Sequence, residues 1–76
     1  MTREIRETMA KALASQGEAC KRIVRDVRTA AINANGAFVK DLNVKRKGDV
    51  AIQKVYTEGI RSIDDLIKEK QREILT

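Results

Sequence analysis

The chain has 76 residues, of which 42% are apolar and 36% charged, and it contains no Pro and no His. Its length allows one small domain, and the lone Cys excludes an internal disulfide and indicates an intracellular, reducing setting. No apolar run approaches the roughly 18–20 residues that cross a bilayer, so no membrane partner is expected.

Basic residues outnumber acidic residues in this composition. There are 16 Lys and Arg against 11 Asp and Glu, which gives a net charge of +5 and a pI near 9.7. Lys and Arg neutralise phosphates and release the counterions bound to them. The charge balance therefore favours a polyanion such as nucleic acid as partner.

A first long helix is predicted over about residues 3–41. Thr2 can cap its start, and Glu4 suits the positive end of the helix dipole. The pair Asn35-Gly36 is a weak point, so the alternative is a helix that ends at Gly36 and is followed by a separate short turn of helix. The longer helix is favoured because apolar and small residues keep steps of three, four or seven across this pair. These residues are Ile5, Met9, Leu13, Cys20, Val24, Val27, Ala31, Ala34, Phe38 and Leu42.

The best candidate for a turn is the basic segment 43–48, Asn-Val-Lys-Arg-Lys-Gly. Asp49 can cap a second helix, predicted over about 49–75, in which apolar residues again recur every three or four positions. A short connection between two long helices implies an antiparallel hairpin. The predicted fold class is therefore all-α, with residues 1–76 forming a single helical module.

Both apolar stripes are wider than the contact line of a two-stranded coiled coil. Ile23-Val24 on the first helix and Leu66-Ile67 on the second double the apolar positions. We therefore expect further helical surface to complete the core. The hairpin is predicted either to be part of a three-helix bundle or to self-associate as a homodimer into a four-helix bundle.

Residues suited to covalent or metal chemistry are scarce. Cys20 lies on the apolar stripe without an imidazole to activate it, so a buried, inert thiol is expected. One Cys and no His cannot form the usual structural zinc sets. The pair Asp64-Asp65, between apolar Ile63 and Leu66, is interpreted as solvated helix surface. The chain is therefore not expected to be an enzyme, nor to hold a cofactor or metal ion.

A basic cluster on the first helix is the strongest binding pattern. Lys21, Arg22, Arg25 and Arg28 lie on adjacent helical turns, and Arg presents a planar fork to phosphate oxygens. The alternative is a solvated face with local ion pairs, such as Glu18 with Arg22. Because no aromatic residue interleaves the cluster, contact with the backbone of folded RNA is favoured over stacking on single-stranded bases.

The sequence resembles the ribosome recycling factor family along nearly its whole length. Residues 1–6, Met-Thr-Arg-Glu-Ile-Arg, are similar to the family's Leu-Thr-x-Glu-x-Arg. Glu18 followed by residues 24–28, Val-Arg-Asp-Val-Arg, matches the family's Glu and Val-Arg-x-Val-Arg. Residues 70–75, Lys-Gln-Arg-Glu-Ile-Leu, resemble its closing Lys-Glu-x-Glu-Leu/Ile. The Val-Arg-x-Val-Arg run is the most specific of these segments.

The resemblance implies the second and third helices of a three-helix domain, whose first helix and inserted β-rich domain have no counterpart in this sequence. It implies binding between the ribosomal subunits, together with a translocating GTPase. It also assigns Arg25 and Arg28 to contacts with large-subunit ribosomal RNA, with Arg6 on the same surface. We add the neighbouring Lys21 and Arg22 to the expected RNA-binding residues because they lie at helical spacing from Arg25 and Arg28.

The sequence departs from the family pattern at two places. Residues 29–32, Thr-Ala-Ala-Ile, follow the arginine motif where the family commonly has Arg-Asp-Ala-Asn, and Arg28-Thr29 is closer to mitochondrial members. The predicted turn is shorter than the family's and is basic where the family is usually acidic. Docking on the ribosome is therefore the part of the family's function that we expect.

Two functional hypotheses follow. The first is a ribosome-binding module of recycling-factor type that acts in translation termination and ribosome recycling by docking on large-subunit ribosomal RNA. It would work in the bacterial cytoplasm or in an organelle such as the mitochondrial matrix. The alternative is a helical protein–protein interaction or dimerisation module without RNA binding, whose net charge serves only solubility. Titration with RNA distinguishes them.

Overall fold

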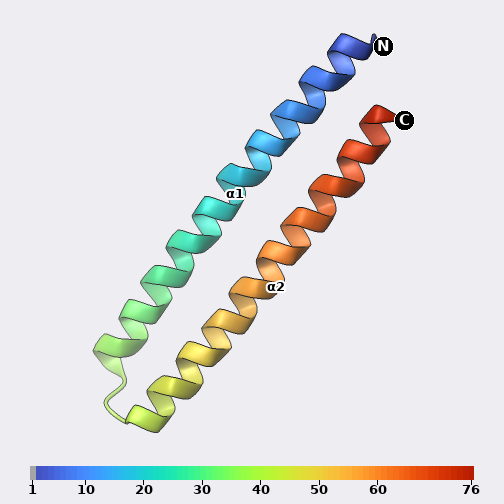
Figure 1. Cartoon of the computed structure of the whole chain (residues 1–76). Helices are drawn as coiled ribbons and strands as arrows, with labels where there is room; N and C mark the ends of the chain where they lie inside the picture. Colours follow the sequence, from blue (N-terminus) through green and yellow to red (C-terminus); the bar gives the residue numbers. More distant parts are fainter. Residues whose placement is uncertain (1) are drawn as a thin grey trace.

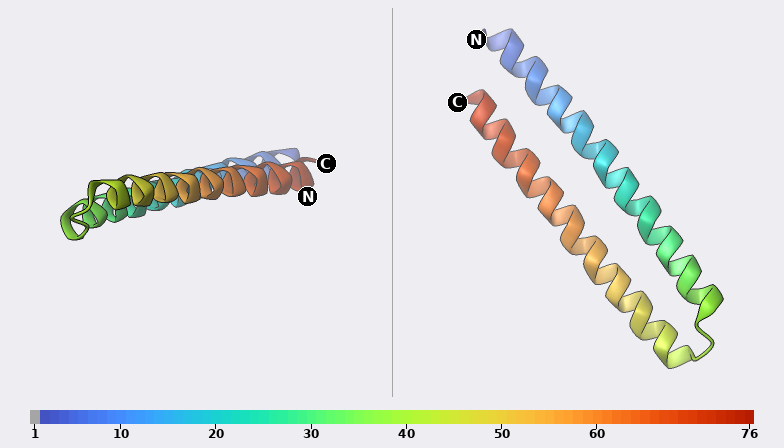
Figure 2. Two further views of the ribbon diagram at one scale, coloured as in Figure 1. Left: turned by 90° about the horizontal axis from the view of Figure 1, so that it is seen from below. Right: turned by 180° about the vertical axis from the view of Figure 1, so that it is seen from behind.

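The computed structural model describes residues 2–76 and consists of two long helices (Figure 1). α1 is Arg3–Phe38, with 36 residues, and α2 is Leu42–Leu75, with 34 residues. The helices run antiparallel and side by side, as all the views agree (Figure 2). The all-α class and the predicted hairpin are confirmed. Met1, the first residue of the predicted 1–76 module, lies outside the described residues.

The start of α1 is the one predicted, but its end is not. The Thr2 Oγ1 atom accepts a hydrogen bond from the Ile5 N–H at 3.2 Å, so Thr2 is the N-cap. α1 continues through Gly36, so the alternative helix end at that residue is wrong. The helix stops at Phe38, short of the predicted residue 41, because the next residue, Val39, is extended and its N–H bonds back to the helix.

The chain reverses earlier than predicted. The turn was expected at residues 43–48, but it comprises residues 39–41, and α2 begins at Leu42. The basic segment 43–48 therefore forms the first turns of α2, and the predicted start of the second helix at residue 49 is wrong.

A different aspartate from the predicted one caps α2. The Asp41 carboxylate accepts hydrogen bonds from the Asn43 N–H at 2.8 Å and the Val44 N–H at 3.2 Å, which satisfies two backbone donors of the first turn. Asp49 lies a full two turns inside the helix. There its Oδ1 accepts a hydrogen bond from the Asn35 side-chain amide at 3.0 Å.

α1 contacts α2 through small and polar residues, which we call the seam. Ala10 and Gly17 are the buried residues of α1, and none of the α2 residues is buried. The seam positions alternate steps of four and three, the spacing of a coiled-coil contact line. The α1 seam residues are Ala10, Ala14, Gly17, Lys21, Val24, Arg28, Ala31 and Asn35.

Most of the predicted apolar stripe lies beside the seam and forms one uncovered side of the hairpin, which we call the apolar face. Phe38 is 84% exposed, Val27 62% and Val55 69%. Cys20, expected to be buried, is exposed because this face has no covering layer among residues 2–76. The apolar face comprises Met9, Leu13, Cys20, Val27, Ala34 and Phe38 of α1 and Val44, Ala51, Val55 and Leu66 of α2.

The molecule is a flat rod. Its principal extents are 59 × 15 × 8 Å. The start of α1 and the end of α2 lie at one end of the rod, and the turn lies at the other (Figure 1). Neither helix of the described chain combines the length and apolar character needed to cross a membrane.

Candidate nucleic-acid interface

Arg22 and Arg25 are the exposed members of the predicted basic cluster. Arg25 comes two residues before Val27 of the apolar face, which is about 200° around α1, so it lies on the opposite side of the hairpin. There it lines a shallow hollow together with Lys21, Tyr56 and other side chains of both helices. None of the ion pairs formed within residues 2–76 involves Arg22 or Arg25. Their guanidinium groups are therefore available to an external anion.

Lys21 is held by carboxylates of its own chain. Its Nζ lies 2.8 Å from the Glu18 Oε1 atom and 2.9 Å from the Asp64 Oδ1 atom. Two hydrogen bonds raise the pKa of the Lys21 ammonium above its ordinary value, and the bond to Glu18 contributes more than the bond to Asp64. Glu18 thus pairs with Lys21, where the sequence indicated Arg22. The charge of Lys21 is largely balanced inside the hairpin, so Lys21 is a weaker candidate for an RNA contact than its neighbours.

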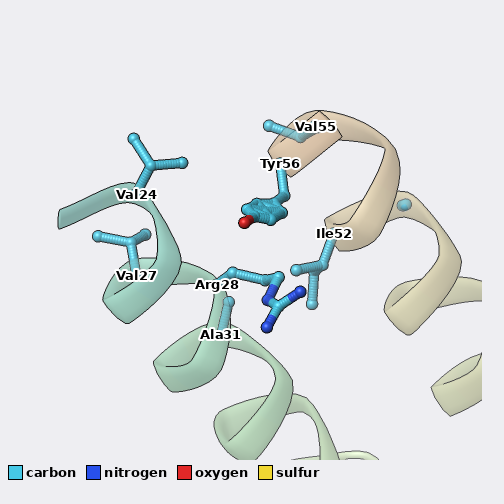
Figure 3. Close-up of a pocket in the computed structure, with 8 residues that line it drawn as sticks. Val24, Val27, Arg28, Ala31, Ile52, Val55 and Tyr56 are labelled. Carbon is cyan, nitrogen blue, oxygen red and sulfur yellow. The ribbon is translucent and has the colours of Figure 1, made fainter. Parts of the chain in front are cut away.

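Arg28 extends across the seam toward α2, as Figure 3 shows. Its Cζ lies 4.4 Å from the centre of the Tyr56 ring, a cation–π geometry. Its Nη1 donates to the Gln53 Oε1 atom at 3.4 Å. Its Nε is buried and has no hydrogen-bond partner in the described chain. Arg28 therefore packs between the helices, and it fixes Tyr56 at the edge of the hollow that Arg25 lines.

Arg6 lies apart from the other four predicted residues. It is half-buried and lines a hollow at the open end of the hairpin with Arg3, Glu7 and Leu75. Arg6 and Arg25 are nineteen positions apart along α1, which corresponds to about 28 Å along the helix axis. The structure thus brings Lys21, Arg22, Arg25 and Arg28 together and leaves Arg6 at a separate place.

Sequence reasoning missed the α2 residues that organise the cluster. Asp64 was interpreted as solvated surface, yet it binds Lys21 across the seam. Tyr56 and Gln53 were not considered as partners of Arg28. One signal in the sequence points to such partners. The alternation of four and three steps places Lys21 and Arg28 on the same contact line as the buried Gly17, so both side chains are expected to meet residues of the other helix.

An open groove lies on the opposite side, within the apolar face. Its volume is about 310 Å³, and its walls are mainly aliphatic (Figure 3). Arg28 and Tyr56 form its polar edge. The remaining lining residues are Val24, Val27, Ala31, Ala51, Ile52 and Val55. In residues 2–76, no group of three or more His, Cys, Asp or Glu side chains is placed to hold a metal ion.

Comparisons with known proteins gave consistent matches over the whole chain. The sequence pattern of the family described as "Ribosome recycling factor" matches residues 1–75. The ribosome-recycling factor of Bacteroides thetaiotaomicron is 32% identical over 79 residues, covering 100% of this chain and 42% of the relative. That of a Nitratiruptor species is 35% identical over 79 residues, covering 99% and 42%. The protein of Xylella fastidiosa 9a5c is 30% identical over 80 residues, covering 100% and 43%.

This chain therefore spans less than half the length of the curated relatives that it matches. The comparison with solved structures gave no match.

Proposed function

Because the chain belongs to the ribosome recycling factor family, we propose that it is a ribosome-binding module of recycling-factor type that docks on large-subunit ribosomal RNA. It acts in translation by non-covalent docking and not by enzymatic chemistry. The observation that supports this most directly is the pair Arg22 and Arg25, exposed on a helix face and without an ion pair among residues 2–76, inside the region that matches the family.

The charged side of the hairpin suits the backbone of folded RNA. Arg22 and Arg25 lie three residues apart, so they project from neighbouring helical turns. Guanidinium groups bind phosphate oxygens through two parallel hydrogen bonds. α1 is continuous through this segment, so the spacing of the two Cα atoms is fixed before binding. Phosphate contact of this kind positions a protein without reading base sequence.

The other three predicted RNA-binding residues take supporting parts in this proposal. Arg28 holds Tyr56 beside Arg25 and presents only the outer edge of its guanidinium group to RNA. Lys21 adds little net charge because two carboxylates neutralise it. Arg6 makes a separate contact near the open end of the hairpin.

The partners and the compartment follow from the family. The proposed partner is the ribosome, and cooperation with a translocating GTPase is part of the same proposal. A protein that binds ribosomes is intracellular, in the bacterial cytoplasm or in an organelle with ribosomes of its own.

The test is co-sedimentation with ribosomes at increasing salt concentration. The native chain is compared with the double variant Arg22→Ala, Arg25→Ala. Each lost phosphate contact lowers the slope of log K against log salt by about 1, so we expect a decrease of about 2 and weaker binding at every salt concentration.

A matched control removes two exposed arginines of α2, in the double variant Arg61→Ala, Arg72→Ala. It loses the same net charge and is expected to keep most of the binding of the native chain. Equal binding by the native chain and the Arg22, Arg25 variant would remove the claim for these two residues. Absence of binding by the native chain would overturn the proposed function.

A further inference from the structure

A shallow hollow on the charged side of the hairpin, opposite the apolar face, is built by residues of both helices. Glu18, Lys21 and Arg25 of α1 line one wall, and Tyr56 and Ile60 of α2 line the other. Its volume is about 180 Å³. Sites that enclose a free small molecule have about 300–1,000 Å³. The hollow therefore suits one unit of a polymer that lies across it.

The two ends of the α1 wall carry opposite charges. Arg25 forms no ion pair within residues 2–76. The Lys21 ammonium lies 2.8 Å from the Glu18 Oε1 atom, which leaves the second carboxylate oxygen to accept another hydrogen bond. Lys21 itself is balanced by Glu18 and Asp64. A ligand in the hollow therefore meets an unpaired cation at one end and a hydrogen-bond acceptor at the other.

The distance between these ends selects the kind of ligand. Glu18 and Arg25 are seven positions apart along α1, which corresponds to about 10 Å along the helix axis. A row of phosphates along this line is disfavoured, because the Glu18 carboxylate repels it. One nucleotide is favoured, because its phosphate and its 2′-hydroxyl lie on different sides of the sugar.

The α2 wall between these ends is apolar. Tyr56 and Ile60 are both half-buried and project from neighbouring turns of α2. The Tyr56 ring is positioned before binding, because the Arg28 guanidinium lies 4.4 Å from its centre and donates a hydrogen bond to Gln53 (Figure 3). The C–H groups of a sugar gain dispersion contacts on a wall of this kind.

We propose that this hollow binds one ribose-phosphate unit of RNA and thereby distinguishes RNA from DNA. The Arg25 guanidinium binds the phosphate, and the sugar packs on Tyr56 and Ile60. The Glu18 carboxylate accepts a hydrogen bond from the 2′-hydroxyl, the group that DNA lacks. Such a contact requires no particular base sequence. The inference rests on the proposed function, because Arg25 is one of the two phosphate contacts proposed there.

The first experiment compares two ligands that differ only at the 2′ position. They are a short, fluorescently end-labelled RNA hairpin and the same hairpin with 2′-fluoro groups in place of its 2′-hydroxyls. The two share their charge and their A-form shape, but fluorine donates no hydrogen bond. Fluorescence anisotropy at low salt measures both affinities. The native chain is expected to bind the RNA hairpin about 10-fold more tightly, which corresponds to one hydrogen bond to a charged group.

A pair of variants assigns this preference to the hollow. Glu18→Ala removes the acceptor and is expected to bind the two hairpins equally, and each of them more tightly than the native chain binds the 2′-fluoro hairpin, because a repelling charge is lost. The matched control is Glu58→Ala, an exposed position of α2 that does not line the hollow. It loses the same charge and is expected to keep the preference of the native chain.

The second experiment observes the hollow in the native chain and needs no variant. The chain has one Tyr and one Phe, so the ring signals of Tyr56 and Phe38 are assigned directly in an NMR spectrum. Addition of the RNA hairpin is expected to shift the Tyr56 ring signals and the Ile60 methyl signals. The Phe38 signals, on the apolar face, are expected to stay in place.

Several results would overturn the role of the hollow. They are a native chain that binds neither hairpin or binds both equally, a preference that Glu18→Ala retains, and RNA binding that leaves the Tyr56 signals unchanged. The proposed function would survive these results if the chain still co-sediments with ribosomes through Arg22 and Arg25. Conversely, a chain that distinguishes the hairpins but does not bind ribosomes would support the hollow and overturn the proposed function.

Discussion

Gly17 and Gly48 lie where α1 and α2 approach closely. A Cβ added at Gly17 would lie 2.8 Å from the Ile67 Cγ1 atom, and one at Gly48 would lie 2.7 Å from the Asn35 side-chain nitrogen. Real Cβ atoms do not approach other atoms so closely. At both positions the absence of a side chain, and not backbone freedom, is what the fold requires.

Substitution of two glycines of α1 by alanine is therefore expected to have opposite effects. Gly17→Ala pushes against the branched Ile67 side chain and is expected to lower the free energy of unfolding by about 1–3 kcal/mol. At Gly36 the nearest atom to an added Cβ is the flexible Lys45 Cε at 3.3 Å. Gly36→Ala is therefore expected to raise the free energy of unfolding by about 0.5–1 kcal/mol. Urea denaturation monitored by circular dichroism measures both. A stabilised Gly17→Ala variant would contradict the close packing described for the seam.

The sequence did not predict the position of the turn or the surroundings of Arg28. Gly48 after the basic residues suggested a turn, but it lies inside α2 because Asn35 packs against it. Arg28 follows Val24 by four residues and Val27 by one, and the pattern alone does not say which valine shares its side. The structure places Val24 and Arg28 in the seam and leaves Val27 exposed.

At the level of whole helices, periodicity was sufficient to predict two helices and their antiparallel order. It was insufficient for their ends, because both Asp41 and Asp49 precede helical sequence and either suits an N-cap. A contact with α1 determines which aspartate is the N-cap. The Asn35 side-chain amide donates hydrogen bonds to the Lys45 carbonyl oxygen at 2.9 Å and to the Asp49 carboxylate at 3.0 Å, and both acceptors lie inside α2. Sequence patterns within one helix do not contain this contact.

The cap of α2 provides a test at this scale. Asp41→Ala removes the acceptor of two backbone N–H groups and is expected to lower the free energy of unfolding by about 0.5–2 kcal/mol. Asp41→Asn keeps an oxygen acceptor and is expected to retain most of that stability. Urea denaturation of the three proteins measures the difference. An equal loss in both variants would show that the negative charge at the positive end of the helix dipole, and not the cap hydrogen bonds, stabilises the start of α2.

For the molecule as a whole, the contact between α1 and α2 buries little. Ala10 and Gly17 are the buried residues of the described chain.

The start of α1 and the end of α2 lie at one extremity of a 59 Å rod, and this placement has a mechanical consequence. Anything joined to either terminus is attached at the same extremity, so the hairpin behaves as an arm carried by its base. The turn at residues 39–41, with the cationic segment 43–48 beside it, is then the part that reaches farthest from any such attachment. A fluorophore or affinity tag at either terminus leaves this distal extremity unobstructed.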